Sequence, residues 1–195
     1  MKFIRYYAEK LCGEMVERKI VKEEDRELYI YGMVNGVILA GNLLTAILIG
    51  ILTGRLDMIL AFLLFYASLR TYSGGYHLES KLLCYLFSTL ILPVPVYTQK
   101  WVQNHVPLGI IIFLGILAVA VILVLAPVES IHKRLEPEEH RFFRRVSHCI
   151  VSIQTCIVVG VYYLELDALG YAGYVSILLV AFFMIIGQIH AKRYT

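Results

Sequence analysis

The sequence predicts an all-α, polytopic membrane protein that forms a single integral membrane domain over residues 1–195. Hydrophobic residues make up 59% of the chain and charged residues only 17%, whereas soluble domains carry about 25% charged residues. The apolar residues are gathered in runs close to the ~20 residues that a helix needs to cross a bilayer. No polar segment exceeds about 30 residues, which is too short for a separate soluble domain of roughly 50 residues or more.

The first 28 residues are expected to form a charged, cytoplasmic helical segment. Apolar residues recur there at three- and four-residue spacing, with lysines and arginines between them: Phe3, Ile4, Tyr7, Leu11, Met15 and Val16. This spacing is typical of an amphipathic helix lying on the membrane surface. It fits equally well a helix that packs beneath the transmembrane helices.

Six apolar spans follow within residues 29–189, which are expected to form the transmembrane bundle. We place them at Tyr29–Leu52, Leu56–Leu69, Leu82–Thr98, Pro107–Ala126, Cys149–Leu166 and Tyr171–Ile189. The second span is short for a crossing. The third carries Pro93 and Pro95, which remove helix hydrogen bonds, so we expect it to be kinked or broken.

The distribution of basic residues predicts the orientation in the membrane. Of the 18 lysines and arginines, all but Arg55 and Lys100 fall on one side of the six-span arrangement. Lysine and arginine are enriched in cytoplasmic connections. Both termini, the 70–81 loop and the basic 127–147 loop are therefore expected to face the cytoplasm.

The segment "RTYSGGYHLESKLLC", residues 70–84, places an unusual set of polar residues between two apolar spans. Ionisable residues so close to lipid are costly and point to function. Gly74 and Gly75 allow a sharp turn. Cys84 is a candidate nucleophile because a helix N-terminus and a nearby base both favour the thiolate. His77 is the candidate base, and it would later protonate a leaving amine.

The spacing of His77 and Cys84 constrains how they can meet. Seven residues on one straight helix would separate them by about 10 Å along the axis, whereas proton transfer needs roughly 3 Å or one bridging water. The chain between them must therefore fold back, and a re-entrant loop protected inside the bundle would allow this. A non-catalytic interpretation also fits the pattern, with Cys84 as a small buried hydrophobe and His77 bonded to a backbone carbonyl.

The segment resembles the signature of the accessory gene regulator B (AgrB) family of bacterial membrane peptidases. That signature has an Arg, a Gly shortly before a catalytic His, and a catalytic Cys seven residues after the His. The matching positions here are Arg70, Gly75, His77 and Cys84. Leu78 departs from the family pattern, which often has a small residue after the His.

The resemblance extends over the whole chain. It includes the charged N-terminal segment, the multiple spans and the basic loop "APVESIHKRLEP" from Ala126 to Pro137. It implies a cysteine endopeptidase that cleaves the C-terminal tail from an AgrD-like quorum-sensing propeptide through an acyl-enzyme on Cys84. Transfer of the acyl group to a Cys or Ser of the propeptide then gives a thiolactone or lactone ring. Membrane lipids are the other expected contact, and nucleic acid is not an expected partner.

Some assignments remain open at this stage. Glu79 and Ser73 are nearby candidates for an oxyanion donor or for a third residue that orients His77, and Gly74 lies beside them. Arg70 would either hold a substrate carboxylate bidentately or extend to the membrane interface. The resemblance implies a homodimer. The Gly32-xxx-Gly36 spacing suits a dimer contact or internal packing of the first span.

The main rival interpretation is a small membrane transporter or channel without peptidase activity, its polar residues lining a pathway. A transporter is expected to show inverted repeats or paired broken helices, and only one span here carries helix-breaking prolines. The HExxH and GxSxG motifs and the Walker A sequence are absent, so zinc peptidase, serine hydrolase and ATPase classes have no support. No metal ion or cofactor is expected.

Overall fold

The computed structural model describes residues 2–75, 81–128, 136–164 and 167–193, and these are helical throughout apart from short connections. In chain order the elements are α1 (Lys2–Glu17), the short 3-10 helix η1 (Glu23–Asp25), α2 (Arg26–Leu52), α3 (Leu56–Ser73), α4 (Lys81–Ile91), α5 (Val94–His105), α6 (Leu108–Leu125), α7 (Pro137–Tyr163) and α8 (Asp167–Arg193). The predicted all-α class is confirmed.

Five of the described helices are long and apolar enough to cross a membrane: α2, α3, α6, α7 and α8. The predicted third span is instead divided, because α4 ends at Ile91 and Pro93 caps the start of α5. With 11 and 12 residues, α4 and α5 each extend over less than about 20 Å, which is less than the ~30 Å hydrocarbon core. The predicted third span is therefore two short helices, neither long enough to cross alone, with the break at the predicted prolines.

The structure corrects the expectation of a loop over residues 127–147. Helix α7 begins at Pro137, so much of that segment is helical, and the predicted span from Cys149 is the continuation of the same helix. Pro137 suits the first helical position. Glu136 and Glu139 form a capping box in which the Glu136 N–H donates to Glu139 Oε2 at 3.3 Å. The sequence pattern missed this start because the first turns of α7 are charged.

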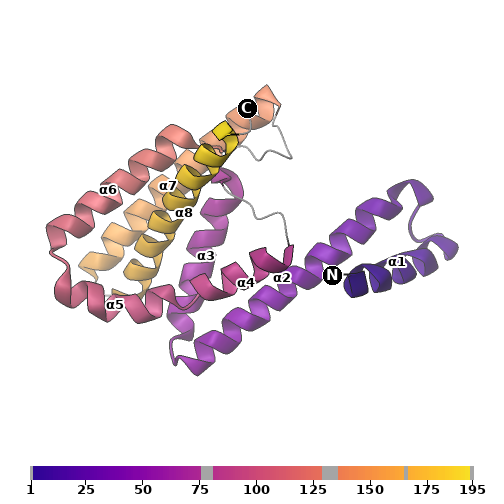
Figure 1. The fold of residues 1–195 in the computed structure, drawn as a ribbon, viewed down its shortest axis with the longest axis horizontal. Helices are drawn as coiled ribbons and strands as arrows, with labels where there is room; N and C mark the ends of the chain where they lie inside the picture. The colour runs from indigo at the N-terminus through magenta and orange to yellow at the C-terminus, as the bar shows by residue number, and fades with distance from the viewer. Residues whose placement is uncertain (1, 76–80, 129–135, 165–166, 194–195) are drawn as a thin grey trace.

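Helix α8 lies at the centre of the bundle and packs against α3, α6 and α7 (Figure 1). Small residues, among them Ala172 and Gly173, allow this close approach. A buried polar contact adds to it, since Gln154 Nε2 of α7 donates to the Phe65 carbonyl at 2.9 Å and to Ser68 Oγ at 3.0 Å, both on α3. The core is thus built on α3, α7 and α8.

The short helix α5 is held at one end of this bundle. Arg55 Nη2, just before α3, donates to Gln99 Oε1 at 3.3 Å. The Tyr171 hydroxyl, in the first turns of α8, donates to Thr98 Oγ1 at 2.9 Å. The starts of α3 and α8 therefore meet α5 at the same end, and the ends of α3 and α8 lie at the other.

The N-terminal helix α1 packs against the first half of α2, and this hairpin extends away from the other helices (Figure 1). Ala8 and Cys12 are buried there against Ile30 and Val34. The sequence left membrane-surface and packed positions open for this helix, and the structure pairs one face of it with α2. Its outer face still exposes large apolar side chains: Phe3, Tyr6, Tyr7 and Leu11.

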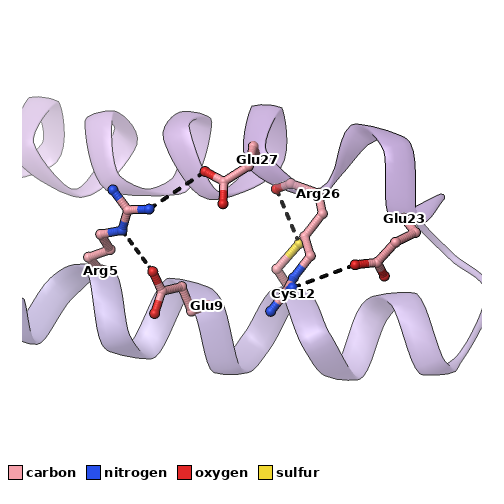
Figure 2. A network of polar contacts seen from close by, with 6 residues as sticks. All are labelled: Arg5, Glu9, Cys12, Glu23, Arg26 and Glu27. Atoms are coloured by element: carbon pink, nitrogen blue, oxygen red, sulfur yellow. Dashed lines mark hydrogen bonds and ion pairs between the residues drawn. The ribbon is translucent and has the colours of Figure 1, made fainter.

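Polar contacts line the same interface (Figure 2). Arg5 pairs with Glu9 at 2.7 Å and with Glu27 of α2 at 3.6 Å. The hydrogen bond that Arg5 donates to Glu9, together with the negative charges of Glu9 and Glu27, raises the pKa of Arg5 above its usual value. The Cys12 thiol donates to the Arg26 carbonyl at 3.7 Å. Because the ion pairs are exposed, apolar burial is the main attraction between α1 and α2.

We predict that Gly173→Leu destabilises the protein. A Cβ on Gly173 would lie 2.6 Å from Val158 Cγ2 and 3.4 Å from the Phe65 ring, so a larger side chain would force α8 away from α7 and α3. Overpacking of this kind costs about 1–3 kcal/mol. The matched control is Gly160→Leu on α7, where the added Cβ meets nothing within 4 Å. Thermal unfolding in detergent is the measurement, and equal loss of Tm in both variants would contradict the packing argument.

Candidate functional site

The candidate site begins where α3 ends, at the two adjacent glycines. Gly74 follows the last residue of α3 with φ 69° and ψ −151°, and Gly75 has φ 120°. Both φ values are positive, in a region that residues with a Cβ seldom adopt. The sharp turn predicted from the glycine pair is present, and the backbone at both positions requires glycine.

This turn joins the segment that follows α6. Val128 N–H donates to the Ser73 carbonyl at 2.9 Å, and Gly75 N–H donates to the Val128 carbonyl at 3.3 Å. The two segments run parallel here, forming an isolated β-bridge between Gly74 and Val128. A Cβ on Gly74 would collide with the Val128 carbonyl oxygen. The residues 70–75 and 126–128, separated by about fifty positions in the sequence, therefore form one junction, in which Ser73, Gly75 and residues 126–128 are buried.

Arg70, one turn before the glycines, contacts the same turn. Its Nη1 donates a hydrogen bond to the Gly74 carbonyl, and its guanidinium occupies the space that a Cβ on Gly75 would need. Arg70 thus stabilises the loop that follows its own helix. Its two roles considered from the sequence, holding a substrate carboxylate or extending to the interface, stay predictions.

The nucleophile candidate lies at the start of α4. Since α4 begins at Lys81, Cys84 is its fourth residue, close to the N-terminus of the helix. His77 and Glu79 lie outside the described residues, as does the side chain of Cys84. The catalytic pairing of His77 with Cys84 therefore stays a prediction.

Phe183 of α8 lies against both the glycine turn and helix α4. The carbonyl oxygen of Phe183 lies 3.2 Å from the position of a Cβ on Gly75. The Phe183 ring meets the ring of Phe87 edge to face, with 5.5 Å between the ring centroids, and Phe87 is three residues after Cys84. Phe183 was not singled out in the sequence, because it resembles every other apolar residue of its span.

The start of α7 lies at the same end of the bundle. The ring of Tyr72, near the end of α3, is 5.8 Å from the ring of Phe143 in α7. Basic side chains of this part of α7 are exposed: Arg141, Arg144 and Arg145. The candidate site therefore has exposed arginines beside it, on the first turns of α7. Among the described residues, no three His, Cys, Asp or Glu side chains are grouped to hold a metal ion.

The fold and this junction define a class of protein: a multi-pass helical membrane protein whose candidate nucleophile follows a glycine turn anchored inside the bundle. A model of the family described as accessory gene regulator B, AgrB, matches residues 8–185, nearly the whole chain, and the chain belongs to this family. Family membership links it to the processing of quorum-sensing peptides. Searches of curated proteins and of solved structures found no match.

We predict that Gly74→Ala disrupts the junction. The added Cβ would strain a positive-φ residue and displace the Val128 carbonyl, with a cost on the order of 1–3 kcal/mol. The control is Gly109→Ala in the first turn of α6, where the Cβ meets nothing within 4 Å. Thermal unfolding in detergent and precursor cleavage are the measurements. If Gly74→Ala kept the wild-type Tm and the wild-type cleavage rate, the junction would not be needed for stability or for cleavage.

Proposed function

We propose that this protein is a membrane cysteine endopeptidase that removes the C-terminal tail of an AgrD-like propeptide. Cys84 is the proposed nucleophile and His77 the proposed general base. The observation that carries the proposal is the Arg70–Cys84 motif in a chain that belongs to the AgrB family. The place of Cys84 close to the N-terminus of α4 supports it, because the helix dipole there favours a thiolate.

The proposed reaction starts with transfer of the Cys84 thiol proton to His77. The thiolate attacks the carbonyl carbon of the scissile peptide bond, and His77 returns the proton to the leaving amine of the released tail. A thioester remains on Cys84. A Cys or Ser side chain within the propeptide then attacks this thioester, which frees the Cys84 thiol and closes a thiolactone or lactone ring. Exclusion of water from the site favours ring closure over hydrolysis.

The junction explains how such a site tolerates its membrane position. In this turn Arg70 donates to the Gly74 carbonyl, and Gly75 N–H donates to the Val128 carbonyl. These backbone groups therefore have internal partners and do not need water near the lipid. The chain leaves the junction at Gly75 and re-enters a helix at Lys81. His77 lies outside the described residues, and the proposed pairing requires that it does not continue the helix of Cys84.

We further infer that the site faces the cytoplasm. The exposed arginines at the start of α7 lie at the same end of the bundle as the junction, and basic residues concentrate on the cytoplasmic side. This surface would also attract an acidic substrate tail. A homodimer stays part of the proposal, and a Cβ added at Gly32 or Gly36 meets nothing within 4 Å, which leaves this face of α2 open to a second helix.

We predict that Cys84→Ala abolishes precursor cleavage while the protein still inserts and folds. Without the thiol no acyl-enzyme forms, so product should fall to the level seen without enzyme. Purified enzyme in lipid vesicles with a synthetic precursor, followed by mass spectrometry, measures product and the covalent adduct. Cys149→Ala and Cys156→Ala are controls, because both thiols are exposed and lie on α7. Cleavage by Cys84→Ala at a normal rate would end the peptidase proposal.

We predict that His77→Gln lowers cleavage by about 10²–10⁴-fold, the usual loss when acid–base help is removed. Gln keeps polarity and approximate size, so folding should survive. The rate of Cys84 alkylation against pH, with the other three cysteines replaced, is the decisive measurement. The thiolate loses a cationic partner, so alkylation near neutral pH should slow. An unchanged pH profile would show that the two side chains do not interact in the resting enzyme.

A further inference from the structure

Helix α4 is tied to α2 by a hydrogen bond between two hydroxyl groups. Tyr85, the residue after Cys84, places its hydroxyl oxygen 2.5 Å from Thr45 Oγ1 in the second half of α2. Both side chains are partly buried. The Tyr85 ring also lies against Gly41, where an added Cβ would be 3.9 Å from the ring.

The direction of this hydrogen bond follows from the second contact of Thr45. Thr45 Oγ1 lies 2.8 Å from the Gly41 carbonyl, which can only accept. A threonine hydroxyl carries one hydrogen, so Thr45 donates to Gly41 and must accept from Tyr85. The result is a relay from the Tyr85 hydroxyl through Thr45 to the α2 backbone. Linked hydrogen bonds of this kind strengthen one another in a medium of low dielectric constant.

Helix α4 is packed into the core at its far end, where Ile91 is buried, and the relay adds a directional contact near Cys84. The helix is only 11 residues long, and its exposed leucines Leu83, Leu86 and Leu90 face outward. Its contact toward α8 is the edge-to-face pair of Phe87 and Phe183. Apolar contacts between helices in a membrane favour one orientation only weakly, because lipid chains provide equivalent apolar contacts. The hydroxyl relay is directional, so it fixes the rotation of α4 about its axis.

We propose that Thr45 and Tyr85 are positioning residues that set the rotation of α4 and thereby aim Cys84 at the scissile carbonyl. The inference rests on the proposed function, in which Cys84 is the nucleophile. Adjacent residues on a helix are fixed relative to each other, so anchoring the Tyr85 ring anchors the backbone of Cys84. A displacement of about 1 Å at a reacting group can cost on the order of 10²-fold in rate. The relay therefore acts on catalysis without touching substrate.

The test compares Tyr85→Phe, Thr45→Val and the double variant in lipid vesicles with a synthetic precursor. Each single variant removes the same hydrogen bond at nearly constant shape, so each should lower kcat by about 10-fold with KM little changed. The double variant should be no slower than either single variant, because the interaction is already lost. Thr45→Ser keeps the hydroxyl and should restore most of kcat.

The matched control is Thr89→Val on the same helix. The Thr89 hydroxyl donates to the Tyr85 carbonyl within α4, so its loss breaks no contact with another helix, and kcat should stay at the wild-type value. Thermal unfolding of each variant shows whether a fall in activity comes from a misplaced Cys84 or from loss of folded protein. A lower Tm with unchanged kcat per folded enzyme would overturn the proposal. Single variants at the wild-type rate, or effects that multiply in the double variant, would overturn it as well.

Failure of the inference and failure of the proposed function give different results. If Cys84→Ala still cleaves the precursor, the peptidase proposal is wrong. If Cys84→Ala is inactive and the relay variants are fully active, only the positioning role is wrong. Alkylation of Cys84, with the other cysteines replaced, adds a readout that needs no substrate. Tyr85→Phe and Thr45→Val should change its rate equally, and a change in only one of them would contradict a shared relay.

Discussion

The backbone junction between the end of α3 and the segment after α6 is the constraint on which the candidate site depends. Two glycines without Cβ atoms let Val128 approach closely enough to exchange hydrogen bonds with Ser73 and Gly75. Arg70 then closes the turn through the Gly74 carbonyl. Since backbone groups at membrane depth need internal partners, these contacts let a non-helical turn lie buried at the edge of the bundle.

The central helix α8 connects this junction to the rest of the fold. Its small residues admit α3 and α7 at close range, and Gln154 adds hydrogen bonds between α7 and α3. Nearer its end, Phe183 packs its carbonyl against Gly75 and its ring against Phe87. The turn that precedes the candidate base and the helix that carries the candidate nucleophile therefore share a support that is remote from both in sequence.

The break in the third span sets the length of the helix that carries the candidate nucleophile. Pro93 ends the run that begins with α4, and the short helix that remains holds Cys84 near its start. A short helix has little length over which to pack, so single contacts count for more in setting its position. The hydroxyls of Tyr85 and Thr45 provide one such contact, and it is specific in direction where the surrounding apolar contacts are not.

The sequence alone determined the all-α class, the apolar spans, the break at the prolines, the glycine turn and the place of Cys84 near a helix start, because each follows from local composition or backbone chemistry. It did not determine the long charged start of α7, whose capping box lay within an apparently polar loop. Nor did it assign roles to Val128, Thr45 and Phe183, which look like ordinary residues of their segments. Only the tertiary structure decided these, because their importance lies in contacts between segments distant in the chain.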